Sequence, residues 1–170
     1  KMNVMTLDGP EIHLTQGALD GLKLRLKRTI LAPGDAGYED SRTVWNAMID
    51  RKPAMVVRCL GTADVIACVQ FARAHGLLLS IKGGGHNIGG LAVADGAMML
   101  DMSLMRGVWV DPRRRVARAQ AGCLRRQFRA GRIRAVSAAI LQPQADRAER
   151  RARRRDFICI PDAFTRFGLP

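Results

Sequence analysis

The centre of the chain alternates between short apolar runs and a helical pattern. Residues 55–60 form a β-branched, apolar run that predicts a buried strand. Thr62 is a suitable N-cap for a helix that runs to His75, and Gly76 is placed to end it. Residues 77–81 predict a second strand. Strand, helix and strand at this spacing predict a βαβ unit with a parallel pair and a right-handed crossover.

The two predicted helices each have an apolar face. Residues 14–28 predict a short amphipathic helix, because leucines recur there at helical spacing. These leucines are Leu19, Leu22 and Leu26. In the central helix we expect Val65, Val69 and Ala72 to face the core, with Ile66 beside them.

Further elements flank this centre. Residues 38–50 mix polar and apolar positions and predict an irregular segment or a helical turn. Residues 97–102 predict a third strand. Residues 108–110 and 116–120 lie on either side of an Asp-Pro-Arg turn and predict a β-hairpin.

A glycine-rich loop, Lys82–Gly90, follows the second strand. Successive glycines allow positive φ and close approach, so consecutive backbone N–H groups can point at one anion. Lys82 adds a positive charge, and His86 offers a nucleophilic imidazole. The loop is neither a Walker loop nor a Rossmann turn, because no Gly-Lys-Ser/Thr and no helical pattern follow it. A tight glycine turn without a ligand stays open as an alternative.

Charge is concentrated near one end of the chain. The 170 residues carry a net charge of +13, and residues 123–170 hold 12 of the 28 Lys and Arg against four of the 15 Asp and Glu. An arginine-rich segment of this kind favours acidic partners, so non-specific nucleic-acid binding is an alternative function. No nucleic-acid-binding motif and few aromatic residues accompany it, and a solvated, disordered tail is the simpler interpretation.

The cysteines and the apolar runs bear on location. Four scattered cysteines without metal spacing are typical of reduced thiols. No apolar run approaches the length of a membrane span, and the N-terminal residues have no signal-peptide pattern. We therefore expect a cytoplasmic protein with no membrane partner and no metal site.

Several motifs follow one another in a consistent order over about residues 30–122. They are Pro33-Gly34-Asp35, Val44-Trp45-Asn46, Val57-Arg58-Cys59, His75-Gly76-Leu77, Lys82-Gly83-Gly84-Gly85-His86-Asn87, Leu100-Asp101-Met102-Ser103, Val110-Asp111-Pro112 and Ala119-Gln120-Ala121-Gly122. In these motifs the chain resembles the FAD-linked oxidoreductases of the vanillyl-alcohol-oxidase superfamily, with PCMH-type FAD-binding domains, in their berberine-bridge-enzyme-like branch.

The resemblance implies an FAD site at the glycine-rich loop. In many family members the histidine matching His86 is bonded to the 8α carbon of the flavin, so His86 is the candidate for a covalent link. The family's catalytic bases match no position of this chain, so no catalytic residue is assigned. The expected cofactor-binding residues are Lys82, Gly83, Gly84, Gly85, His86, Asn87 and Gly90.

The fold class implied is α+β. We expect an N-terminal helical extension over 1–29, a partial PCMH-type FAD-binding domain over 30–122, and an irregular arginine-rich tail over 123–170. The abrupt change of composition at Cys123 leaves two interpretations of this tail, a frame-shifted sequence or a disordered one. Family members continue with a second glycine-rich stretch and a substrate domain that this sequence does not match. We therefore expect weak or absent turnover from this chain alone, with a small-molecule substrate bound only by longer relatives.

Overall fold

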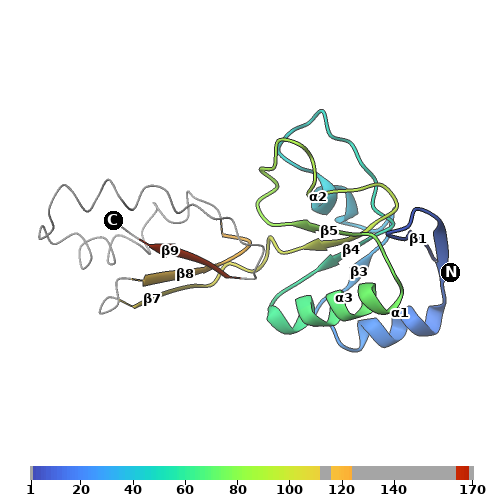
Figure 1. Cartoon of the computed structure of the whole chain (residues 1–170), viewed down its shortest axis with the longest axis horizontal. Coiled ribbons are helices and arrows are strands. Elements are labelled where there is room, and N and C mark those ends of the chain that lie inside the picture. Colours follow the sequence, from blue (N-terminus) through green and yellow to red (C-terminus); the bar gives the residue numbers. More distant parts are fainter. Residues whose placement is uncertain (1, 112–115, 124–163, 169–170) are drawn as a thin grey trace, which may run out of the picture. The chain divides into compact units, whose positions relative to one another are not determined.

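A computed structural model describes residues 2–111, 116–123 and 164–168. The chain forms two compact units, residues 1–105 and 106–170. The first unit has mixed α+β structure, as expected (Figure 1). Its elements are β1 (Met2–Met5), β2 (Glu11–Leu14), α1 (Gln16–Lys23), β3 (Ile30–Leu31), α2 (Tyr38–Arg42), β4 (Met55–Arg58), α3 (Thr62–Ala74), β5 (Leu79–Lys82) and β6 (Met98–Asp101).

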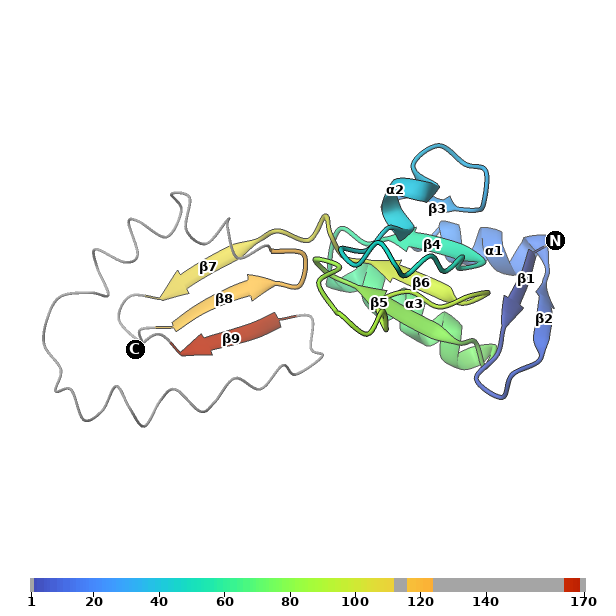
Figure 2. The ribbon, with the colours of Figure 1, turned by 90° about the horizontal axis from the view of Figure 1, so that it is seen from above.

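The main sheet has the strand order β3-β4-β6-β5 (Figure 2). Strands β4, β6 and β5 are parallel, and β3 joins β4 in antiparallel orientation. The two strands around α3 are therefore parallel but do not pair, because β6 lies between them. Burial explains this correction. All four residues of β6 are buried, which suits an inner strand, whereas β5 leaves Ile81 41% exposed at the edge.

Two layers of structure cover the sheet. In Figure 1, α1 and α3 lie along one side of the sheet, while α2 and the long loops lie on the other. The core on the α2 side joins residues of α2 and the loops to Val56 and Met99 of the sheet. Burying a side chain of this size stabilises a fold by roughly 1.5–3 kcal/mol. The other members of this core are Tyr38, Val44, Ala92 and Val93.

The central helix α3 begins and ends close to the predicted positions, but it buries a different face. Gly61 is its N-cap, and Gly76 follows its C-cap with a positive φ of 63°. Val69 and Ile66 are 42% and 50% exposed. Ala72 is buried as expected, and the other buried residues are Asp64, Ala67, Cys68 and Phe71.

Asp64 explains the rotation of α3. Its carboxylate is 1% exposed and accepts hydrogen bonds from the backbone N–H groups of Leu60 (2.8 Å) and Lys27 (3.2 Å). A buried carboxylate needs such donors. Satisfying it turns the helix so that the small residues meet the sheet and Val69 faces outward.

The first helix is shorter than its leucine pattern predicts. The Thr15 hydroxyl accepts a hydrogen bond from the N–H of Ala18 at 3.2 Å, which caps the start of α1. Leu19 and Leu22 are buried as expected, but the helix ends at Lys23 and Leu24 is 89% exposed.

The second unit contains the predicted hairpin. Strand β7 (Val108–Asp111) pairs with β8 (Val116–Gln120) in antiparallel orientation, and β8 also pairs with β9 (Phe164–Gly168). The strand β9 falls in the segment expected to be irregular, so that expectation is corrected at these five residues. The two interpretations of the tail otherwise fall on residues 124–163, outside the described residues. Within the described part of the chain, no helix is both long and apolar enough to cross a membrane.

Candidate cofactor site

The glycine-rich loop begins at the carboxyl end of β5, in the part of the sheet where β5, β6 and β4 run parallel. Ligands of open α/β sheets bind outside the carboxyl ends of such strands. Residues Gly84, His86 and Asn87 of the loop are exposed at this edge. The position of the loop is therefore suited to ligand binding.

Two glycines give the loop its conformation. Gly85 and Gly90 have φ values of 71° and 70°, which side-chain-bearing residues rarely adopt. A Cβ on Gly85 would lie 3.5 Å from Val44 Cα, and one on Gly90 would lie 2.8 Å from Ile49 Cγ2. Gly90 therefore tolerates no larger residue unless Ile49 moves.

Part of the loop, residues 83–87, has backbone N–H groups without an acceptor among the described residues. None of the amides of residues 83–87 donates a hydrogen bond to another described residue. A run of amides without acceptors, at glycines that have no Cβ, is the arrangement that holds phosphate oxygens in proteins. The loop thus fits the diphosphate of a dinucleotide cofactor.

A second loop, residues 43–53, holds the glycine-rich loop in place. The N–H of Trp45 donates to the carbonyl of Gly85 at 2.9 Å, and Asn46 Nδ2 donates to the carbonyl of Ile88 at 3.1 Å. Within the glycine-rich loop, Asn87 Oδ1 accepts from the N–H of Leu91 at 3.1 Å. Asn87, a predicted cofactor-binding residue, thus shapes the loop through its side chain.

The ammonium group of Lys82 donates hydrogen bonds to the end of α2 and the start of the second loop. The side chain is buried, and Nζ donates to the carbonyls of Ser41 and of Thr43, the latter at 3.1 Å. Burial lowers the pKa of Lys82, and the nearby Asp101 carboxylate partly opposes that shift. Sequence reasoning placed this charge beside the cofactor. The structure uses it to hold the end of α2 against the sheet.

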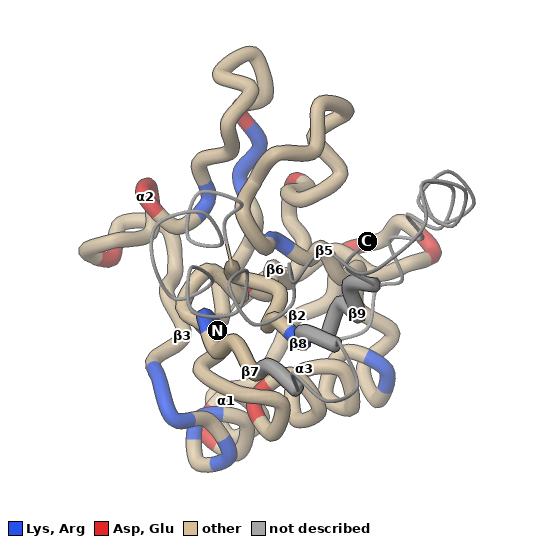
Figure 3. Tube along the Cα trace, turned by 90° about the vertical axis from the view of Figure 1, so that its left-hand side faces the viewer, with Lys and Arg blue, Asp and Glu red and all other residues tan. Residues whose placement is uncertain are grey.

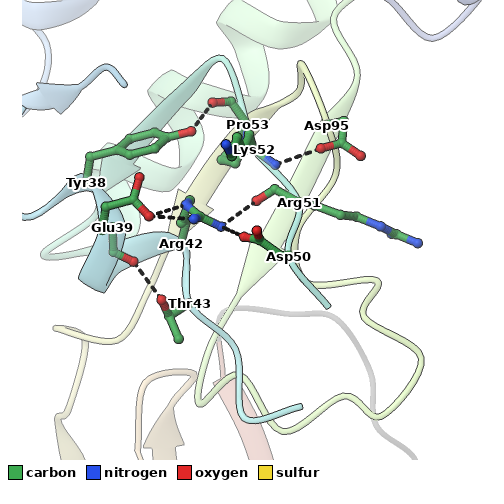
Figure 4. Close-up of polar contacts among 9 residues, drawn as sticks. All are labelled: Tyr38, Glu39, Arg42, Thr43, Asp50, Arg51, Lys52, Pro53 and Asp95. Carbon is green, nitrogen blue, oxygen red and sulfur yellow. Dashed lines mark hydrogen bonds and ion pairs between the residues drawn. The ribbon is translucent and has the colours of Figure 1, made fainter. Parts of the chain in front are cut away.

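Arg42 fastens the second loop to α2 (Figure 4). Its guanidinium donates to Glu39 at 2.8 Å, to Asp50, and to the carbonyl of Arg51 at 3.1 Å. The hydrogen bonds to Glu39 and Asp50 raise the pKa of Arg42. The hydrogen bond between Arg42 and Asp50 also lowers the pKa of Asp50.

Four further hydrogen bonds hold the second loop and the segment after the glycine-rich loop. The Tyr38 hydroxyl donates to the carbonyl of Pro53 at 2.6 Å, and Asp95 accepts from the N–H of Lys52 at 2.7 Å (Figure 4). Arg51 Nη1 reaches back to the carbonyls of Gly90 (3.3 Å) and Val93 (3.2 Å). Sequence reasoning missed these residues because charged residues in an irregular segment carry no local signal of their partners.

His86 presents an accessible imidazole. The residue is exposed, and its ring makes no hydrogen bond with any described residue. It directly follows Gly85, whose carbonyl is held by Trp45. The backbone beside His86 is thus held in place, while its nitrogens remain available for a bond to a ligand.

Three cysteines fall within the described residues. Cys59 and Cys68 are buried, and the neighbouring Cys68 thiol, together with burial, raises the pKa of the Cys59 thiol. Cys123 belongs to the second unit, where its thiol donates to the carbonyl of Gly107 at 3.6 Å. Buried thiols with a raised pKa are poor nucleophiles. No group of three His, Cys, Asp or Glu among the described residues could hold a metal ion.

The charges of the described residues bear on the nucleic-acid alternative. In Figure 3, Lys and Arg lie on several separate elements, with Asp and Glu also distributed along the trace. The arginines of residues 124–155, on which the alternative rests, fall outside the described residues. Neither the structure nor the comparisons with known proteins support it.

Comparison with known proteins identifies the same region. Residues 53–132 match the family model described as an FAD binding domain. The chain is 32% identical over 101 residues to (R)-6-hydroxynicotine oxidase of Paenarthrobacter nicotinovorans. The aligned residues cover 59% of this chain and 22% of that protein. It is 36% identical over 88 residues to glucooligosaccharide oxidase of Sarocladium strictum. Here the aligned residues cover 51% of this chain and 17% of that protein.

Solved structures agree with these sequence relatives. The structure of 6-hydroxy-D-nicotine oxidase from Arthrobacter nicotinovorans matches 59% of this chain and 22% of its own, with a TM-score of 0.55 and 32% identity. BBE-like 1 of Physcomitrella patens matches 61% of this chain and 23% of its own, with a TM-score of 0.55 and 24% identity, which shows the fold alone. The chain therefore spans about a fifth of the length of the relatives that it matches.

Proposed function

We propose that this chain, whose residues 53–132 belong to the FAD-linked oxidoreductases of the vanillyl-alcohol-oxidase superfamily, binds FAD as part of a flavin-dependent oxidoreductase. Bound FAD would supply the redox chemistry, accepting a hydride from a C–H bond of a small organic substrate. Both relatives named above are oxidases by name. We infer the same reaction class here and place the protein in the cytoplasm.

The single observation that carries this proposal is the run of open amides at residues 83–87. A diphosphate needs several donors at close range, and backbone amides at glycine positions provide them without a Cβ in the way. Gly83, Gly84 and Gly85 would contact the diphosphate through the backbone. Asn87 and Gly90 would maintain the conformation of the loop. Lys82 would hold in place the end of α2 and the second loop, on which the glycine-rich loop rests.

His86 is the residue that we propose to bond covalently to the flavin. Its imidazole is exposed at the end of the open-amide segment, so the ring system of a bound flavin could reach it. One imidazole nitrogen would join the 8α carbon in place of a C–H bond of the 8-methyl group. The two electrons and two protons released would pass to the flavin itself, and dissolved oxygen would then take them up as hydrogen peroxide. Such a link would prevent loss of the cofactor from this chain.

The test is to purify the full chain, incubate it with FAD, and measure both reversible binding and flavin retained after acid precipitation. Quenching of tryptophan fluorescence reports binding, because Trp45 is 69% exposed beside the loop. We expect His86→Ala to bind FAD reversibly and to lose the acid-stable flavin. His13→Ala, which removes an exposed histidine from β2, is the matched control and should keep it.

The outcomes separate the two parts of the proposal. A folded wild-type chain that binds no FAD would overturn the cofactor assignment. Reversible binding without any acid-stable flavin in the wild type would overturn the covalent link alone. Circular dichroism of each variant establishes that it is folded.

A further inference from the structure

Three charged residues end the three parallel strands side by side. Arg58 of β4 pairs in register with Asp101 of β6, and Asp101 pairs in register with Lys82 of β5. Residues in register lie on the same face of a sheet. This face also carries Val56 and Met99, which pack on the α2 side. The row Arg58–Asp101–Lys82 therefore lies on the side of the sheet that the two loops cover.

Asp101 lies on the strand between Arg58 and the strand that leads into the glycine-rich loop. Asp101 is 1% exposed, and its Oδ1 accepts from the N–H of Ser103 at 3.0 Å. Its Oδ2 lies 3.4 Å from Arg58 Nε, outside hydrogen-bond geometry, so both of these buried atoms lack a hydrogen bond among the described residues. Because β6 lies between β4 and β5, this contact draws the arginine in the direction of Lys82 and the loop.

The row carries one surplus positive charge, and Arg58 is the residue positioned to use it. The Lys82 ammonium already donates to two carbonyls. The Arg58 side chain is 34% exposed, and Asp101 is its partner among the described residues. Arg42 and Arg51, the other arginines near the loop, are engaged by carboxylates and carbonyls.

We propose that the guanidinium of Arg58 binds the diphosphate held by the loop amides, and that Asp101 is the positioning residue that directs it there. This inference rests on the proposed FAD site and deepens it. Two strand spacings separate Arg58 from Lys82, roughly 10 Å between backbones. An extended arginine side chain and a diphosphate together cover that distance. Guanidinium groups bind phosphate oxygens in pairs, which adds geometric specificity to charge.

The experiment compares ligands with and without a diphosphate. FAD, ADP and riboflavin are titrated into the full chain, Arg58→Gln, Arg58→Lys and the control Arg73→Gln, which removes an exposed arginine from α3. We expect Arg58→Gln to weaken FAD and ADP binding at least tenfold and to leave riboflavin binding unchanged. Arg58→Lys should be intermediate and Arg73→Gln close to wild type. The affinity of Arg58→Gln should also depend less steeply on salt.

Asp101→Asn separates positioning from simple electrostatics. Removing a negative charge near an anion site should strengthen ADP binding if only net charge matters. We expect weaker binding, because the guanidinium loses the group that orients it. Tighter binding by Asp101→Asn would overturn the positioning role.

Two results distinguish failure of this inference from failure of the FAD assignment. If the wild-type chain binds FAD, and folded Arg58→Gln binds FAD and ADP as tightly as the wild type does, only the role of Arg58 is overturned. Wild-type chain that binds neither ligand overturns the FAD site itself. Thermal unfolding of each variant confirms that it is folded. If Arg58→Gln does not fold, the binding of FAD and ADP is compared between the wild type and Arg58→Lys, which keeps the charge.

Discussion

The ammonium of Lys82 donates to the backbone carbonyl of Thr43 at 3.1 Å, across a separation of 39 residues in the sequence. Lys82 is the last residue of β5, and Thr43 is the C-cap of α2. The carbonyls at the end of a helix lack intrahelical donors and attract a positive charge. A residue next to the cofactor loop therefore stabilises the segment on which that loop rests.

Burial of Lys82 predicts a pH dependence of stability. Its folded-state pKa lies below its ordinary value of 10.5, so between the two values the unfolded chain binds more protons than the folded chain. The free energy of unfolding of the wild type, relative to Lys82→Met, should therefore rise as the pH increases through this window. Urea unfolding at a series of alkaline pH values measures it. Lys27→Met, at an exposed position, should show no comparable trend.

Tyr38 should give the opposite sign. Its hydroxyl is buried and donates to the carbonyl of Pro53 at 2.6 Å, and burial raises its pKa above 10.0. The stability that this group contributes is complete below 10.0 and is lost as the pH rises through the folded-state pKa. At neutral pH, Tyr38→Phe should lower the free energy of unfolding by roughly 0.5–1.5 kcal/mol. Urea unfolding at a series of alkaline pH values measures this: the free energy of unfolding of Tyr38→Phe should fall less than that of the wild type as the pH rises. Parallel curves of free energy against pH for the two proteins would contradict the prediction.

Gly90 should be less tolerant of alanine than Gly76. Both have positive φ, so alanine costs about 1–2 kcal/mol at each from backbone strain. A Cβ on Gly90 would in addition lie 2.8 Å from Ile49 Cγ2, whereas one on Gly76 would meet nothing within 4 Å. We expect Gly90→Ala to be the more destabilising in urea unfolding. Ile49→Ala should recover part of the difference in the double variant, and strictly additive effects would show that the contact is unimportant.

The contact between Arg42 and Asp50 should stabilise the second loop at neutral pH and should lose that effect at acid pH. The Arg42 guanidinium lowers the pKa of Asp50 below its ordinary value of 3.8. The stability from this contact is therefore present above 3.8 and is lost as the pH falls through the lowered pKa. Hydrogen exchange of the amides in residues 43–53 should speed up in Arg42→Gln at neutral pH. Equal exchange in both proteins would mean that other contacts hold this loop.

Local patterns predicted the secondary structure well where they were strong. The apolar run at β4, the helix that ends before Gly76, the hairpin β7–β8 and the glycine-rich loop all follow from neighbouring residues. The buried face of α3 was predicted only in part: Ala72 is buried as expected and Val69 is not. The choice between Val69 and Phe71 depends on where Asp64 finds its donors. One of these donors, the N–H of Lys27, lies 37 residues away.

The sequence by itself determined that the chain carries a glycine-rich loop after a strand, with a histidine at its end, and its motifs indicated FAD. Only the tertiary structure decided which residues surround that loop. It placed β6 between β4 and β5, turned the Lys82 ammonium to α2, and brought Arg58 beside Asp101. The reason is physical: backbone conformation depends on adjacent residues, whereas strand order and charge pairing depend on groups that only folding brings together.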